Sequence, residues 1–159
     1  LGDHALLAKQ NICARPLVHV PFILRAPGSG LPSTWDSPVS NVDVLPTVMS
    51  LAGLHTPTDI DGCDVSAEMT DDRRHRVFAY AFHEAVAYQN MAVYDGNHKL
   101  LYYPHTERAE LYDLKNDPHE MTDLAGDADQ AERVRELVLD AAMGLMKHTR
   151  AIGHRVCPW

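Results

Sequence analysis

The chain has 159 residues, a formal net charge of −8, 45% hydrophobic residues and 23% charged residues. This length and composition suit one folded globular domain and exclude an intrinsically disordered chain. The acidic balance argues against a nucleic-acid partner, which needs a basic face, and no apolar stretch approaches the roughly 20 residues needed for a membrane span.

The cysteines indicate neither a disulfide framework nor a zinc site. Cys13, Cys63 and Cys157 are odd in number and widely separated, with no Cys-x-x-Cys pair. We therefore expect free thiols.

The first predicted element is a strand over residues 17–25. This stretch is almost continuously apolar, which is typical of a parallel strand covered on both faces. Pro21 should lie at a strand start or a bulge. A polar loop over residues 31–40 should follow.

A helix is predicted from Asn41-Val42-Asp43 to about Ala52. The N-terminal residues suit a helix cap, Pro46 fits the first turn, and Gly53 is placed to end the helix. Residues 55–75 are expected to form a loop with one short turn.

The second half of the chain predicts four strands and a helix. The strands are residues 77–82, 87–94, 99–103 and 110–114, and Asp95-Gly96 predicts a tight hairpin between the second and third. Because short connections favour antiparallel pairing, we expect one antiparallel sheet. The last helix should begin at the cap Asp127, with Gln130 completing a capping box, and pack on this sheet. The tail after Thr149 should be irregular.

Three segments resemble sulfatases of the alkaline-phosphatase-like superfamily. The run Leu1-Gly2-Asp3-His4-Ala5-Leu6-Leu7-Ala8-Lys9, followed by Pro21 to Gly28, is similar to a late active-site segment of that family. Val39 to Leu54 is the most specific match, and Glu110 to Ala125 resembles the phrase that closes the small C-terminal subdomain. The chain is also similar to phosphonate monoester hydrolases.

The resemblance implies an α/β fold in two parts. Residues 1–75 would be the C-terminal remnant of the sulfatase catalytic α/β domain, with its parallel-sheet core. Residues 76–159 would be a small subdomain, a four-stranded antiparallel sheet packed against a C-terminal helix. The first part is thus an α/β fragment and the second is α+β.

The resemblance carries over one catalytic position, Lys9, as the lysine that contacts the sulfate group. A solvated surface lysine is the alternative. Asp3 and His4 match the second acidic-His pair of the family, and the register places the metal-ligating pair before Leu1. His4 would line or support the site, or serve a structural role. Direct metal ligation by Asp3 is the less favoured reading.

A full-length parent would hydrolyse sulfate esters with a formylglycine nucleophile and a bound Ca²⁺ or Mg²⁺. The family's nucleophile motif, (Cys/Ser)-x-Pro-x-Arg, is absent from this sequence, so we expect the chain alone to be inactive and to bind no metal. The first alternative is a phosphonate monoester or phosphodiester hydrolase, which His19 favours. The second is a non-catalytic structural or interaction module.

The expected partners are a sulfate or phosphonate ester and a further protein surface. Because a parallel strand needs neighbours that this chain does not supply, residues 17–25 should pack against a missing N-terminal segment or in a homo-oligomer contact.

Overall fold

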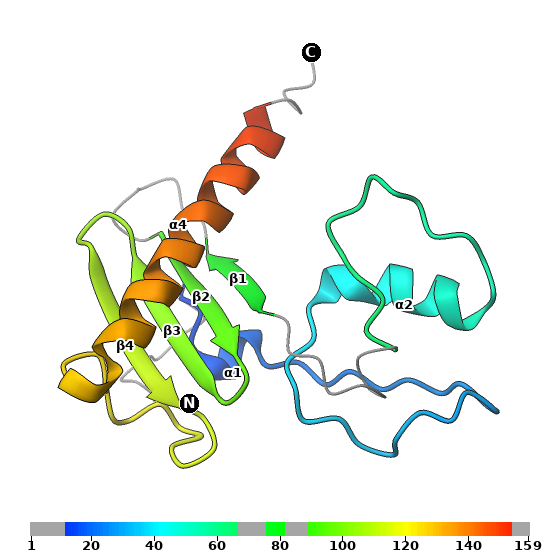
Figure 1. Ribbon diagram of the computed structural model, residues 1–159, viewed down its shortest axis with the longest axis horizontal. Helices are drawn as coiled ribbons and strands as arrows, with labels where there is room; N and C mark the ends of the chain where they lie inside the picture. The colour runs from blue at the N-terminus through cyan, green and yellow to red at the C-terminus, as the bar shows by residue number, and fades with distance from the viewer. Residues whose placement is uncertain (1–11, 67–75, 82–88, 154–159) are drawn as a thin grey trace.

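The computed structural model describes residues 12–66, 76–81 and 89–153. Within them the fold is mixed α+β (Figure 1). An antiparallel sheet and its helix lie on one side, and a region with little regular secondary structure around the short helix α2 (Val44–Leu51) lies on the other. No described helix is long and apolar enough to cross a membrane.

Four strands form the sheet, in the order β1-β2-β3-β4 with all neighbours antiparallel. Their bounds are β1 Val77–Ala81, β2 Asn90–Asp95, β3 His98–Tyr103 and β4 Arg108–Asp113. Gly96 has a φ of 58°, as a tight hairpin between β2 and β3 requires. The predicted antiparallel sheet and its hairpin are therefore confirmed.

A long helix, α4 (Ala131–Gly153), covers one face of the sheet, and the 3₁₀ turn η4 (Ala128–Gln130) precedes it. The predicted packing is confirmed, but two details are wrong. Asp127 stands at the cap position without a side-chain cap hydrogen bond, and the turn is closed by the Gln130 amide donating to the Asp127 carbonyl at 3.0 Å. The helix also continues past Thr149, where an irregular tail was expected.

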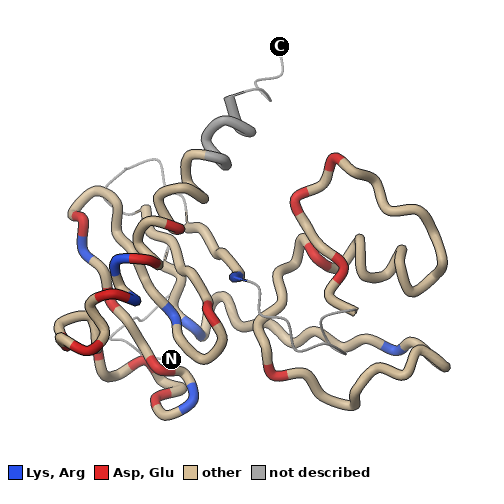
Figure 2. Tube along the Cα trace, viewed as in Figure 1, with Lys and Arg blue, Asp and Glu red and all other residues tan. Residues whose placement is uncertain are grey.

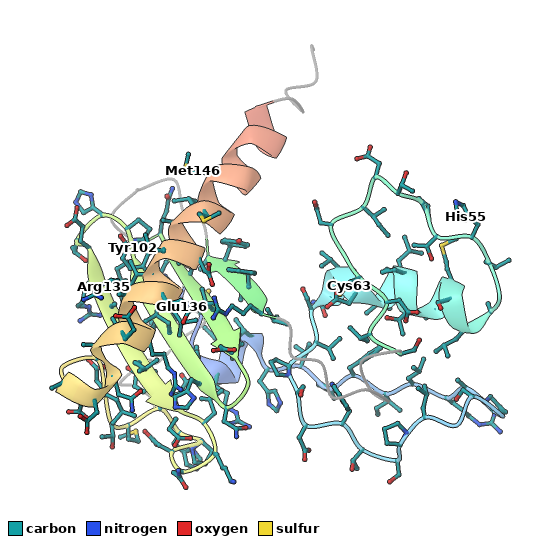
Figure 3. The ribbon with its side chains drawn as sticks, in the orientation of Figure 1. His55, Cys63, Tyr102, Arg135, Glu136 and Met146 are labelled. Atoms are coloured by element: carbon teal, nitrogen blue, oxygen red, sulfur yellow. The ribbon has the colours of Figure 1, made fainter. Side chains whose placement is uncertain are left out.

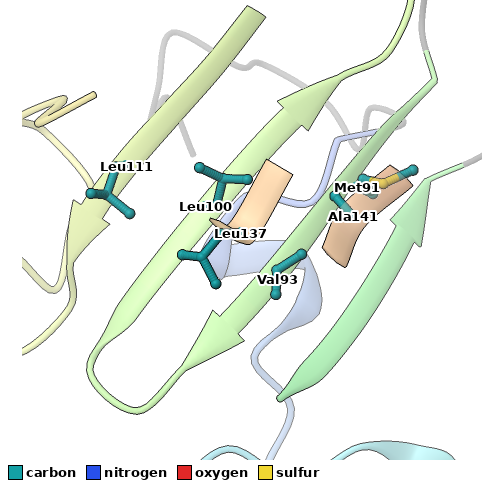
Figure 4. Packing of buried hydrophobic residues seen from close by; sticks show 6 residues of the cluster. All are labelled: Met91, Val93, Leu100, Leu111, Leu137 and Ala141. Carbon is teal, nitrogen blue, oxygen red and sulfur yellow. The ribbon is translucent and has the colours of Figure 1, made fainter. Parts of the chain in front are cut away.

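The main hydrophobic core lies between the sheet and α4 (Figure 4). Because side chains alternate across a strand, one face of each strand supplies this core. All members shown are at most 2% exposed: Met91, Val93, Leu100, Leu111, Leu137 and Ala141.

The opposite face of the sheet is covered by residues 12–18, which include the short helix α1 (Arg15–Val18). Here Cys13 packs with Ala92, Leu101 and Tyr112. The sheet is therefore enclosed between α4 and an N-terminal segment (Figure 1), although the two are more than 100 residues apart in sequence.

The predicted strand over residues 17–25 is wrong. The chain is helical to Val18 and has no regular structure over residues 19–25. Val20, Phe22 and Ile23 are 55%, 39% and 90% exposed. No parallel core is present in the described residues. A continuous apolar stretch indicates a tendency to be buried. A parallel strand also needs neighbouring parallel strands, and the described part of the chain contains none for residues 17–25.

The helix predicted from Asn41-Val42-Asp43 to about Ala52 is confirmed as the 3₁₀ turn η2 (Asn41–Asp43) followed by α2 (Val44–Leu51). Gly53 ends it as predicted, with a φ of 70°, and the Leu54 amide donates to the Met49 carbonyl at 2.9 Å.

The segment that follows β4 returns to pair with that strand. The Leu124 amide donates to the Leu111 carbonyl at 2.8 Å, and Asp123 accepts from the Leu111 amide at 2.9 Å.

Candidate functional site

A buried polar cluster lies where the N-terminal segment meets the sheet. Its centre is Lys99, whose side chain shares a face of β3 with Leu101 and Tyr103 because strand side chains alternate. Lys99 is fully buried, and its Nζ lies 2.7 Å from Glu120 Oε1 and 5.7 Å from the centroid of the Tyr94 ring.

Glu120 connects this lysine to the N-terminal segment. Its side chain is 1% exposed, and its second carboxylate oxygen accepts a hydrogen bond from the Arg15 amide at 3.1 Å. The residue ends the Asp117-Pro118-His119 turn with a φ of 57°, a left-handed conformation that glutamate rarely adopts. One carboxylate therefore joins β3, this turn and the start of α1.

A second connection is made at Asn90, the first residue of β2. Its Oδ1 accepts from the Cys13 amide at 2.8 Å. The Cys13 thiol is buried here, and burial raises the pKa of Cys13 to about 11. Because the thiolate is the nucleophilic form, Cys13 is unsuited to covalent chemistry at neutral pH.

The charges in the cluster compensate one another. Burial lowers the pKa of Lys99, and the attraction of Glu120 acts in the opposite direction. Removing one partner of a buried ion pair typically costs about 3–5 kcal/mol, because the other charge is left unpaired. The ion pair therefore favours the one arrangement of the chain in which Lys99 and Glu120 remain in contact.

A second polar group on the same face surrounds Glu110. Its carboxylate accepts from the Tyr112 hydroxyl at 3.0 Å and pairs with Arg108 at 2.8 Å. The Arg108 guanidinium lies 4.3 Å from the centroid of the Tyr103 ring. Burial, followed by the negative charge of Glu110, raises the pKa of Tyr112, so that this hydroxyl remains a donor.

The described residues do not fit a metal site. No group of three or more histidine, cysteine, aspartate or glutamate side chains among them could hold a metal ion. The two most buried carboxylates are already occupied, Glu120 by Lys99 and the Arg15 amide, and Asp43 by backbone amides. The Ca²⁺ or Mg²⁺ implied by the resemblance therefore has no ligand set in this part of the chain.

The site residues expected from the sequence, Asp3, His4 and Lys9, lie outside the described residues. The buried pair of Lys99 and Glu120 was not predicted. A signal for Lys99 was available, because it takes a position of β3 that alternation assigns to the same face as Leu101. Lysines are so often on the surface that this signal alone does not predict burial.

The most specific sequence motif, Val39 to Leu54, has a structural role. Asp43 is 3% exposed, and its carboxylate accepts from the Ser40 amide at 2.9 Å and the Cys63 amide at 3.0 Å. Thr47 donates its hydroxyl to the Asp43 carbonyl at 2.6 Å and accepts from the Val65 amide at 3.1 Å. These bonds hold the loop that carries Cys63 beside α2 (Figure 3).

The Asp61-Gly62 step of this loop is equally constrained. A Cβ atom on Gly62 would lie 2.0 Å from the Val42 carbonyl oxygen. Only glycine permits so close an approach. The motif and the loop that follows it are therefore matched sterically as well as by hydrogen bonds.

The motif from Glu110 to Ala125 also caps backbone groups. Asp117 accepts from the Met121 and Thr122 amides, both at 2.7 Å, and Asp123 accepts from the Ala125 amide at 2.9 Å. Its aspartates fix the turn that presents Glu120 to Lys99.

A family comparison decides the relationship of the chain. The family model described as "N-sulphoglucosamine sulphohydrolase, C-terminal" matches residues 2–144. The chain belongs to this sulfatase family. The resemblance to sulfatases is thereby confirmed, and the cluster of Lys99 and Glu120 lies within the matched region.

Individual relatives agree with the family. The uncharacterized sulfatase YidJ of Escherichia coli K12 is 29% identical over 168 residues, covering 100% of this chain and 33% of that protein. A structure solved in complex with its substrate, D-glucosamine-2-N,6-O-disulfate, matches with a TM-score of 0.51 and 25% identity over 74% of this chain and 25% of the other.

Structural similarity extends to the phosphonate monoester hydrolase of Silicibacter pomeroyi. The TM-score is 0.52 at 19% identity, over 70% of this chain and 26% of that one, which shows a shared fold alone. The chain spans about a third of the length of the curated relative and about a quarter of these two structures.

Proposed function

We propose that the chain is the C-terminal portion of a hydrolase that cleaves sulfate esters. The family match over residues 2–144 carries this proposal, and a substrate-bound relative with a sulfated amino sugar supports it. In this proposal residues 1–75 belong to the catalytic domain and residues 76–159 form its C-terminal subdomain. The formylglycine nucleophile and the ligands of Ca²⁺ or Mg²⁺ belong to parent sequence outside this chain.

Within the chain, Lys9 is the residue that contacts the sulfate group. An ammonium group supplies a positive charge to the anionic oxygens, and such contacts stabilise charge that develops in the transition state. His4 supports the site, and Asp3 is the less favoured candidate for a metal ligand. The chain alone should have no turnover, because the nucleophile motif is absent from it.

The exposed apolar residues suggest how the parent is assembled. Between residues 12 and 41, only Arg15, Arg25 and Asp36 are charged (Figure 2). Exposed Val20 and Ile23 line an open hollow with residues 31–41 and the start of β1. In our proposal this surface packs against the rest of the parent polypeptide. A homo-oligomer contact is the alternative.

An activity assay tests the proposal. The 159-residue chain and a longer parent polypeptide containing it are assayed with 4-nitrophenyl sulfate and a phenylphosphonate ester. We expect no turnover by the short chain and sulfate-ester cleavage by the long one. Lys9→Met should lower kcat/KM by about 10²–10³, the usual effect of losing one charge-stabilising donor.

The exposed turn residue Lys115 provides the matched control, since Lys115→Met should leave the rate unchanged. Turnover by the short chain, or full activity of Lys9→Met, would contradict the proposal. A clear preference for the phosphonate ester would establish the alternative of a phosphonate or phosphodiester hydrolase, which the shared fold and His19 favour. A parent inactive on both esters would support the non-catalytic module.

A further inference from the structure

We propose that Glu120 and Lys99 are positioning residues, which fix residues 12–15 on the sheet and thereby anchor the described end of the segment that follows Lys9 in sequence. The inference rests on the proposed role of Lys9 for its functional meaning. Its structural content rests only on described atoms, the carboxylate of Glu120, the ammonium of Lys99 and the amide of Arg15.

The chain between Lys9 and this cluster is short. Lys9 stands four residues before Cys13, and four residues span at most about 14 Å when fully extended. Cys13 is 1% exposed and is held by its amide on Asn90. The anchor at Cys13 therefore lies within about 14 Å of chain from Lys9 in sequence terms, and it is made to a sheet whose residues, 77–113, come much later in the chain.

Two separate contacts give the anchor an orientation as well as a location. Asn90 holds the Cys13 amide, and Glu120 holds the Arg15 amide two residues later. The Arg15 side chain adds a third bond, from Nη1 to the Pro118 carbonyl at 3.3 Å. Apolar contacts alone would bury the same segment without fixing its rotation or its register along the strands.

The geometry of Glu120 indicates that its contacts decide its conformation. Left-handed φ values suit glycine and asparagine, and other residues keep them only where the surroundings dictate them. Here the two carboxylate oxygens are divided between Lys99 on β3 and Arg15 on α1. The carboxylate thus holds the Arg15 amide at a fixed place relative to Lys99 and the sheet.

The first test measures local opening in the 159-residue chain. Glu120→Gln and Lys99→Met each leave one buried partner unpaired. Each should accelerate hydrogen exchange at the Cys13 and Arg15 amides at least tenfold, while the Val93 and Leu100 amides in the sheet change less than threefold. Alkylation of Cys13 by iodoacetamide should rise in parallel, relative to exposed Cys63.

A double variant and a control complete this test. Lys99→Met combined with Glu120→Gln should recover most of the protection, because the glutamine oxygen can still accept from Arg15 and no buried charge remains. Glu110→Gln changes a carboxylate on the same face that binds Arg108 and Tyr112, and it should leave the Cys13 and Arg15 amides protected. Equal acceleration across the sheet, or no acceleration at all, would overturn the proposal.

The link to Lys9 is tested in the longer parent polypeptide. Glu120→Gln should lower kcat/KM for the sulfate ester about tenfold, yet it should add nothing to the loss in Lys9→Met, since both act through one group. Additive losses would overturn the positioning role. The exchange and alkylation measurements use no sulfate ester, so failure of the proposed sulfatase activity is distinguishable from failure of this inference.

Discussion

The sheet with α4 and the region over residues 19–66 differ in how they bury their apolar side chains. The sheet packs Leu100, Leu111 and Leu137 to 0% exposure inside the chain itself. In the other region, Ile23 is 90% exposed, and Leu45 and Leu54 are 54% and 60% exposed. The first region has a hydrophobic core of its own, whereas the second is held together mainly by hydrogen bonds around Asp43.

This difference shows that a sequence motif can be highly specific without forming a self-sufficient structure. The Asp43 and Thr47 bonds give residues 40–66 a defined shape. They leave the outer side chains of α2 about half exposed, with Leu45 at 54% and Val48 at 46%. Such a region is suited to being one side of a larger interface.

The largest expected effect is on the core of the sheet. Leu100→Ala should lower the free energy of unfolding by about 2–5 kcal/mol, because it removes buried methyl groups and leaves a cavity. Urea unfolding followed by circular dichroism measures this change. Ile23→Ala serves as the control and should cost less than about 0.5 kcal/mol, as exposed positions do. Similar losses for both variants would erase the distinction between the two regions.

A smaller and local effect is expected at Gly62. Gly62→Ala places a methyl group against the Val42 carbonyl and should destabilise residues 40–66 by about 1–3 kcal/mol, the usual range for overpacking. Hydrogen exchange should accelerate at the Cys63 and Val65 amides and not in the sheet. Gly126→Ala is the matched control, since a Cβ there meets no atom within 4 Å. Acceleration throughout the sheet would mean that the two regions unfold as one.

The ion pairs of Arg76, the residue before β1, with α4 should contribute about 1 kcal/mol. Arg76 pairs with Asp140 and, at 2.6 Å, with Glu136, both on the helix. Arg76→Met should lower stability by this modest amount, because the side chains are partly exposed and screened by solvent. The loss should shrink when thermal unfolding is repeated in 1 M NaCl. A loss independent of salt would show that packing of the arginine stem matters more than its charge.

The smallest effect concerns pH. His98 Nε2 accepts from the Arg133 guanidinium at 2.7 Å, which requires a neutral ring. Burial, followed by the charge of Arg133, lowers the pKa of His98 below its ordinary value of 6.5. The unfolded chain therefore binds this proton more readily, so stability should fall as the pH drops through 6.5 toward the lower folded-state pKa.

Comparison of the wild-type chain with His98→Gln isolates this contribution from the other histidines. The difference in their unfolding free energies between pH 7.5 and pH 5 should be a fraction of 1 kcal/mol, with the variant less sensitive to acid. A variant as sensitive as the wild type would show that His98 does not report on the contact between β3 and α4.

Local signals predicted the sheet and its helix well. Alternating apolar residues, the Asp95-Gly96 hairpin and the helical spacing of Leu137 and Ala141 all describe contacts between the sheet and α4, which form the main core. The same reasoning failed for residues 17–25, where no strand forms and Val20, Phe22 and Ile23 remain exposed in the described chain. The apolar pattern of a segment indicates that its side chains tend to be buried, but it does not indicate whether the strand or helix that would cover them is present.

The candidate site was less accessible to sequence reasoning than the fold. The contact of Glu120 with Arg15 joins positions 105 residues apart, and no periodicity links them. Family resemblance indicated Lys9, yet the described residues do not include it. What resemblance identified in the described part, the Asp43 and Glu110–Ala125 motifs, turned out to cap backbone groups. The residues that match the family in these two motifs therefore serve backbone hydrogen bonding, and a match to the family does not by itself indicate a catalytic role.

The return of residues 123–124 to β4 has a consequence for association between molecules. A strand at the edge of a sheet presents free amides and carbonyls that can recruit a strand from another molecule. Here the Leu111 amide and carbonyl are taken by Asp123 and Leu124 of the same chain. The polar backbone at this position is therefore already satisfied, which makes this part of β4 a poor template for strand addition.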